Sequence, residues 1–290
     1  MLGCGNASDV AVKQETLSSG LIHISVDESF RPVIDSQIQV FESQHPNAKI
    51  IVHYKPEAEC LQDLQVDSIR MVIVTRGLEE SEQKQLKKKL QFAPRFGILA
   101  YDAIAMIVHA NAKDSMFTMQ DVRSMVKGTS NYPYKVVLDG KIATSTVRFM
   151  VDSLLKGEKP SSNVEGALGS EAVLKHVAEN PSSVGLIGVS WIGNPEDPDQ
   201  QSFLKKVKIA SVECRDCEAG PYVKPYQANI YNARYPMIRP LFYILKENYD
   251  GLGSGLMNFM VLEKGQKIFK RAYLLPAKMT FRVQKIDISE

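Results

Sequence analysis

The chain has 290 residues, which is enough for two domains, since a typical domain holds about 100–200 residues. Hydrophobic residues make up 44% of the chain and charged residues 23%, the composition of an ordinary globular protein with a sizeable core. The formal net charge of +2 excludes a dominant basic field for nucleic acid or acidic membranes. A small anionic ligand stays compatible with this charge, because it needs only a few well-placed donors.

Cysteines mark two places in the chain. The start, Met1-Leu2-Gly3-Cys4, resembles the end of a bacterial lipoprotein signal, whose cysteine carries the lipid. We therefore expect a lipidated Cys4, a tether over residues 1–19, and a place in the periplasm or on the cell surface; a chance cysteine is the alternative. The close pair Cys214 and Cys217 favours a local disulfide over a zinc site, because no second ligand pair accompanies it. A pair of reduced thiols is the alternative interpretation.

Short apolar runs alternate with amphipathic stretches through the first 90 residues, which is typical of an α/β sheet covered by helices. The predicted strands cover residues 21–26, 49–54 and 71–74, and the predicted helices cover residues 30–44, 57–64 and 78–90. The last helix begins with glutamates and ends with Lys87, Lys88 and Lys89, which suits the helix dipole. This charge run therefore predicts a solvated helix face rather than a binding patch.

The same alternation continues in a second region. Its predicted strands cover residues 103–110, 135–138, 184–188 and 207–213, and its predicted helices cover residues 119–126, 147–156 and 171–179. After Pro221 the sequence predicts further helices over residues 239–247 and 255–270. No apolar run in the sequence reaches the ~20 residues of a membrane span.

Three junctions place a hydroxyl residue between an apolar strand and a helix. They are Ser29, Thr75 and the triplet Thr144-Ser145-Thr146. Such a hydroxyl can cap its helix, and the helix start exposes unpaired N–H groups. If these junctions converge, they form an oxyanion site without an excess of basic residues, to which Arg76 or Arg148 can add a charge-assisted contact. A single junction of this kind is usually only a helix cap, so the pattern alone leaves both interpretations open.

Five segments, in the same order, resemble the phosphate-type substrate-binding proteins of ABC transporters. They are Ala100–Val108, Phe117–Gly128, Val184–Gly188, Tyr235–Leu241 and Gly265–Pro276, and the resemblance extends over residues 20–280. It implies a two-lobed, periplasmic-binding-protein-like α/β fold, in which each lobe is a mixed sheet flanked by helices and two crossover strands form a hinge. It further implies lobe I over residues 20–100 and 226–290 and lobe II over residues 101–225.

The resemblance also implies a function. The chain would be a monomeric extracytoplasmic receptor that captures phosphate or a related tetrahedral oxyanion and delivers it to an ABC permease, without catalysis, cofactor or metal. By position, the implied ligand-binding residues are Ser29, Phe30, Thr75, Arg76, Thr144, Ser145 and Thr146. An oxyanion sensor is the alternative. An enzyme of phosphate chemistry is less favoured, because the sequence shows no nucleophile–base pair and no metal-ligand spacing.

The chain departs from the family pattern around the implied site. The first-lobe loop is Asp27-Glu28-Ser29-Phe30 instead of a glycine-rich sequence, the triplet lacks its central glycine, and residues 138–141 lack the family's arginine. Arg76 stands where phosphate-specific members have an acidic residue that accepts the ligand's proton. Asp27 or Glu28 would have to take that role, and Arg76 could replace the missing arginine. Phosphate is the first expectation, and sulfate or another oxyanion stays open.

Overall fold

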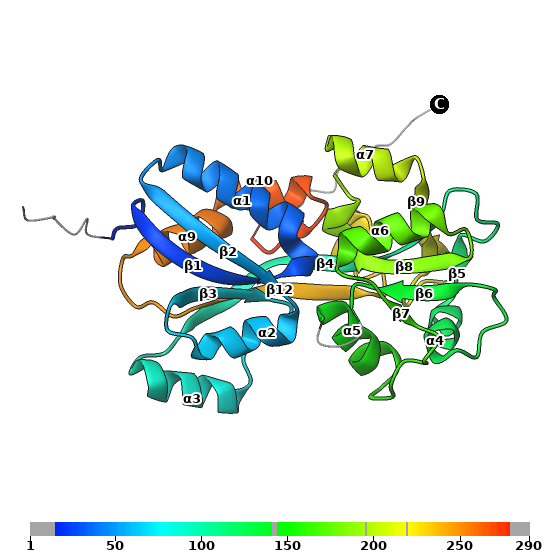
Figure 1. Cartoon of the computed structure of the whole chain (residues 1–290), viewed down its shortest axis with the longest axis horizontal. Helices are drawn as coiled ribbons and strands as arrows, with labels where there is room; N and C mark the ends of the chain where they lie inside the picture. The colour runs from blue at the N-terminus through cyan, green and yellow to red at the C-terminus, as the bar shows by residue number, and fades with distance from the viewer. Residues whose placement is uncertain (1–14, 141–143, 195, 219, 279–290) are drawn as a thin grey trace, which may run out of the picture.

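The protein is a two-lobed α/β molecule, as predicted, with lobe I and lobe II side by side (Figure 1). The structure is a computed structural model and describes residues 15–140, 144–194, 196–218 and 220–278. Cys4 and most of the predicted tether lie outside the described residues. Within the described ranges, no helix is both long and apolar enough to cross a bilayer.

One sheet path runs through both lobes in the order β2-β1-β3-β12-β4-β8-β6-β7. Its strands are β1 (Gly20–Asp27), β2 (Ala48–Lys55), β3 (Ile69–Val74), β4 (Arg95–His109), β6 (Lys135–Leu138), β7 (Glu165–Gly166), β8 (Ser183–Gly188) and β12 (Ile238–Leu245). Beside this path, β9 (Val207–Ile209) and β13 (Leu275–Pro276) pair with β4, and a small sheet joins β5 (Met116–Phe117), β10 (Ser211–Glu213) and β11 (Tyr222–Val223). Strand β1 is parallel to β2 and β3, so hydroxyl residues that follow these strands emerge at one sheet edge.

Helices cover both faces of each lobe (Figure 1). In lobe I, α1 (Arg31–Gln44), α9 (Leu252–Val261) and α10 (Glu263–Arg271) pack on one face, and α2 (Glu57–Gln62) and α3 (Glu80–Leu90) on the other. In lobe II, α4 (Met119–Lys127) and α5 (Ser145–Phe149) cover one face and α6 (Ser170–Glu179) the other, and the lobe also holds α7 (Pro198–Leu204). Helix α8 (Gln227–Tyr231) packs on the lobe II core through Ile230, although the resemblance implies that lobe I resumes at residue 226. This layering buries apolar side chains on both sides of the sheet.

Strands β4 and β12 connect the lobes. β4 pairs with β12 from Arg95 to Ala103 and with β8 from Ile104 to Val108, so a single strand belongs to both halves of the sheet. These are the two crossover strands that the resemblance implies. Tyr235 and Met237, which precede β12, pack in the lobe II core. The exact boundaries of the lobes stay a prediction.

The predicted helix over residues 239–247 is wrong, because this segment is strand β12. It lies between β3 and β4 and pairs antiparallel with both. Leu241, Ile244 and Leu245 are fully buried there, so pairing in the middle of the sheet overrides the helical spacing of the apolar residues. The predicted helix over residues 255–270 is two helices, since Leu262 is extended between α9 and α10. The helix predicted over 147–156 begins at Ser145 and continues as a π-helical turn over Met150–Leu154.

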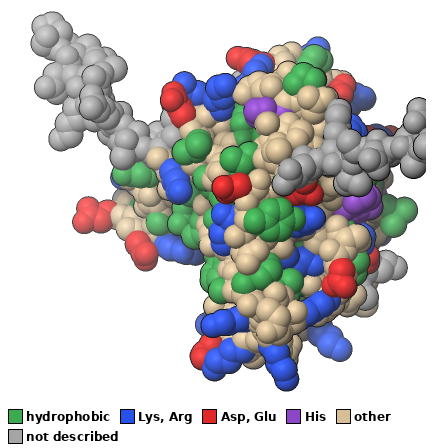
Figure 2. All heavy atoms as spheres, turned by 90° about the vertical axis from the view of Figure 1, so that its left-hand side faces the viewer, with side chains coloured by type: hydrophobic (Ala, Val, Ile, Leu, Met, Phe, Trp, Pro, Cys, Tyr) green, Lys and Arg blue, Asp and Glu red, His purple; other side chains and the backbone are tan. Residues whose placement is uncertain are grey.

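The charged surface of lobe I agrees with its sequence pattern. Figure 2 shows acidic and basic side chains interspersed over this end of the molecule, with basic side chains at the bottom, where α3 lies. Helix α3 has Glu80 and Glu82 in its first turn and lysines in its last, which suits the helix dipole. In lobe II, Cys214 and Cys217 are joined in a disulfide, and Cys60 of lobe I is a free, buried thiol.

Candidate functional site between the lobes

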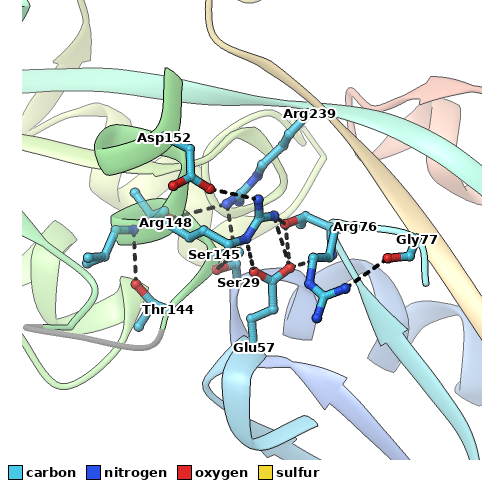
Figure 3. A network of polar contacts seen from close by, with 12 residues as sticks. Ser29, Glu57, Arg76, Gly77, Thr144, Ser145, Arg148, Asp152 and Arg239 are labelled. Carbon is cyan, nitrogen blue, oxygen red and sulfur yellow. Dashed lines mark hydrogen bonds and ion pairs between the residues drawn. The ribbon is translucent and has the colours of Figure 1, made fainter. Parts of the chain in front are cut away.

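Four hydroxyl side chains meet where the lobes face each other. Ser29 follows β1 in lobe I, and Thr144, Ser145 and Thr146 form the start of α5 in lobe II (Figure 3). All four are buried, and the hydroxyl oxygens of Ser29 and Ser145 are 3.4 Å apart. Thr144 caps α5 by accepting a hydrogen bond from the Val147 amide at 3.2 Å. We call these four residues the hydroxyl cluster.

Asp139, which directly follows β6, lies within the hydroxyl cluster. Its carboxylate accepts hydrogen bonds from Thr146 at 2.7 Å, from Thr144 at 2.8 Å and from Ser29 at 3.1 Å. The side chain is almost completely buried, and its donors come from both lobes. Hydroxyl donors from both lobes therefore converge on a single carboxyl group.

Arg239 of β12 supplies the positive charge beside the hydroxyl cluster. Its Nε donates to the Asp102 carboxylate of β4 at 2.8 Å, and its Nη1 donates to Ser145 at 2.8 Å and to Thr146 at 3.3 Å. The guanidinium lies over the ring of Phe30, 5.1 Å from its centroid. Its Nη2 is buried and meets no hydrogen-bond partner among the described residues, so it is a donor available to a ligand.

Two further carboxyl groups adjoin the site from the loop after β1. Burial raises the pKa of Asp27 to about 7, although the nearby Arg239 opposes this, and Asp27 accepts a hydrogen bond from the Ser29 amide at 3.0 Å. Burial, helped by repulsion from Asp139 and Asp27, also raises the pKa of Glu28 to about 7. Glu28 accepts hydrogen bonds from the amide and hydroxyl of Ser170 in lobe II. Both acids are therefore partly protonated near neutral pH.

A second polar network also crosses between the lobes. Glu57 of α2 accepts hydrogen bonds from the amide and hydroxyl of Thr75, at 2.8 and 2.6 Å, and from Arg148 of α5 at 2.5 Å. Arg148 also donates to the Thr75 hydroxyl at 2.8 Å. Burial favours the neutral form of Glu57, but Arg148 outweighs burial and lowers the pKa. Arg148 therefore ties lobe II to lobe I through an ion pair.

The structure brings some of the expected residues together and separates others. Ser29, Thr144, Ser145 and Thr146 converge, whereas Thr75 belongs to the Glu57–Arg148 network. Arg76 forms two hydrogen bonds of 2.7 Å to Glu82 at the start of α3 and does not contact the hydroxyl cluster.

Sequence reasoning missed four residues of this region: Glu57, Asp102, Asp139 and Arg239. Arg239 was part of a resembling segment, but placing it on a helix hid its position in the sheet. In the sequence, Asp139 stands out only as part of the segment 138–141, which lacks the family's arginine. Its short distance in sequence from Thr144 was a usable signal for their contact.

Comparison with known proteins identifies the family. A family model described as a PBP superfamily domain matches residues 11–264. The chain belongs to the PBP superfamily. The phosphate-binding protein PstS of Staphylococcus epidermidis is similar to this PBP-superfamily chain, at 21% identity over 276 residues, covering 89% of this chain and 80% of the relative. PstS of Pseudomonas aeruginosa is also 21% identical, over 98% and 94% of the two chains.

Solved structures agree with the PBP-superfamily fold. A Clostridium perfringens protein, solved with bound phosphate, has a TM-score of 0.72 at 21% identity, covering 89% of this chain and all of the other. An ABC-type phosphate transport receptor from Vibrio cholerae has a TM-score of 0.64 at 18% identity, over 88% and 99% of the two chains. At these identities the structural likeness concerns the fold.

Proposed function

We propose that this PBP-superfamily protein is an extracytoplasmic receptor that captures phosphate, or a related tetrahedral oxyanion, between its two lobes and delivers it to an ABC permease. One observation carries the proposal: a buried anionic group, the Asp139 carboxylate, is held by hydroxyl donors from both lobes. Similarity to proteins named for phosphate binding supports phosphate as the first ligand to test.

The site offers the donors that a tetrahedral oxyanion needs. The hydroxyl cluster supplies short, neutral donors, and the free Nη2 of Arg239 supplies a charged one. Asp27, buried and partly protonated near neutral pH, is the candidate acceptor for a ligand proton in place of the acidic residue that Arg76 replaces. An acceptor of this kind favours phosphate, which keeps a proton at neutral pH, over fully ionised sulfate.

Thermal unfolding in the presence of phosphate, arsenate, sulfate and molybdate tests this function. A ligand that binds only the folded state raises the unfolding midpoint. We expect phosphate and arsenate to raise it, and sulfate to raise it less. If none of the four oxyanions moves the midpoint at millimolar concentration, the capture function is contradicted.

The proposal includes a monomeric protein with a lipid on Cys4. Support for the lipid comes from the likeness of residues 1–4 to the end of a lipoprotein signal. Metabolic labelling with a palmitate analogue should mark the wild-type protein and not Cys4→Ser. Equal labelling of both would contradict the tether.

A further inference from the structure

We propose that Asp139 is a built-in competitor for the oxyanion: its carboxylate and the ligand require the same hydroxyl hydrogens, so capture requires displacement of Asp139. This inference rests on the proposed function and adds what limits the affinity of that site. Three features of the site support it: each hydroxyl has a single hydrogen to donate, the groups around Asp139 are mostly acidic, and a cavity adjoins the Asp139 side chain.

The hydroxyl cluster has few hydrogens to donate. A serine or threonine hydroxyl carries a single hydrogen, so it can donate to one acceptor at a time. Ser29, Thr144 and Thr146 each direct that hydrogen to Asp139. An oxyanion that binds these hydroxyls as donors must take the hydrogens from the carboxylate, and the two bound states exclude each other.

Most of the charged groups around Asp139 are acidic. Asp27 accepts a hydrogen bond from the Ser29 amide, Glu28 directly precedes Ser29, and Asp102 pairs with Arg239 beside Ser145. Among these residues Arg239 is the one cation, and it already pairs with Asp102 at 2.8 Å. Like charges in a buried site repel strongly, because little water screens them. The Asp139 carboxylate would therefore repel a phosphate anion that entered the hydroxyl cluster.

Open space adjoins the Asp139 side chain. It lines a cavity of about 480 Å³ between the lobes, together with Thr144 and Glu28. Arg31 and Lys55 of lobe I line the same cavity. Lys55 already pairs with Asp63 at 2.7 Å, so Arg31 is the cation that would attract the carboxylate. Rotation of the Asp139 side chain toward this cavity would release the hydroxyl cluster for the ligand.

Competition of this kind lowers the apparent affinity for the ligand. The apparent affinity is the intrinsic affinity multiplied by the fraction of protein in which Asp139 does not occupy the hydroxyls. Isothermal titration with inorganic phosphate at neutral pH, on the wild-type chain, Asp139→Asn and Asp139→Ser, tests it. Both substitutions remove the charge, and the near-isosteric asparagine keeps the volume of the side chain. We expect both variants to bind phosphate about tenfold more tightly, or better, than the wild type.

Asp67→Asn is the matched control. It makes the same change of net charge at an exposed lobe I residue that pairs with Lys89, and its phosphate affinity should equal that of the wild type. The unfolding midpoint of each variant confirms that it is folded, and the serine variant serves if the asparagine variant fails to fold.

The possible results separate the two proposals. Tighter binding in the Asp139 variants, or binding only in them, supports competition. Weaker binding would mean that Asp139 accepts a proton from the ligand, and unchanged binding would mean that it plays no part; either overturns the inference and leaves the capture function standing. Absence of phosphate binding in all folded variants overturns the capture function and this inference with it.

Discussion

The hydroxyl of Thr146 lies at the meeting point of the two groups that define the site, 2.7 Å from the Asp139 carboxylate and 3.3 Å from Arg239. Arg76, by contrast, is engaged with Glu82. Sequence spacing alone made both residues candidates for ligand contact. The spacing could not show that Glu82 pairs with Arg76, because this ion pair depends on how helix α3 packs.

This difference predicts opposite results for two substitutions. Under the proposed function, Thr146 donates to the oxyanion, so Thr146→Ala should weaken phosphate binding about tenfold through the loss of one hydrogen bond to a charged group. Arg76→Ala should change the affinity less than about twofold, since Arg76 is held in an ion pair with Glu82 and makes no contact with the hydroxyl cluster. Titration calorimetry measures both; a larger loss for Arg76→Ala would place the site elsewhere.

The buried Asp27 predicts a pH dependence of stability. Its pKa is about 7 in the folded protein and near 3.8 in the unfolded chain, so the protonated form stabilises the fold. That contribution is complete below the unfolded pKa and is lost as the pH rises through about 7. Between about pH 5 and 7.5, the unfolding midpoint of the wild type should therefore fall more steeply than that of Asp27→Asn. Parallel curves for the two proteins would contradict the assignment.

At the scale of elements, the strand–helix alternation of lobe I was predictable because its strands are apolar and its helices are amphipathic. Strand β12 was not, since Leu241, Ile244 and Leu245 have a spacing that also fits a helix. Pro240 faces Tyr101 within the sheet, next to a register shift after Leu241. A proline can sit in an interior strand at such an irregularity, where a regular ladder hydrogen bond is missing. Only the partners β3 and β4 decide between the two structures.

The packing of α10 against the end of α9 depends on a glycine in the first turn of α10. A Cβ atom on Gly265 would lie 2.4 Å from the Phe259 carbonyl oxygen and 2.5 Å from the Met260 Cα, both backbone atoms that cannot move aside cheaply. Gly265→Ala should therefore cost about 2–4 kcal/mol of unfolding free energy, as overpacking of a core does. Gly77→Ala is the control, because its nearest neighbour is a Phe242 side-chain atom at 3.4 Å. Urea denaturation compares them, and equal stabilities would refute the packing argument.

At the scale of the whole molecule, side chains of one lobe bind the other directly. Arg148 reaches Glu57 and Thr75, Glu28 accepts from Ser170, and Ser29 donates to Asp139. The resemblance implied that two lobes face a common site. It could not show these contacts, because they join residues up to 142 positions apart.

Loss of the Arg148 contact should loosen the pair of lobes. Arg148→Met keeps much of the side-chain length but removes the ion pair with Glu57, so the radius of gyration in small-angle scattering should increase. Arg123→Met is the control, since Arg123 pairs with Glu158 within lobe II. An identical radius for all three proteins would mean that Arg148 does not hold the lobes together.

The single tryptophan of the chain gives the molecule an optical reporter. The indole of Trp191 follows β8 in lobe II, and its Nε1 donates to the backbone oxygen of Ser29 in lobe I at 2.8 Å. Separation of the lobes would break this bond and expose the ring to water, which shifts indole emission to longer wavelength. Since no other tryptophan contributes to the signal, the fluorescence of the unlabelled protein would follow the contact between its lobes at Ser29, a member of the hydroxyl cluster.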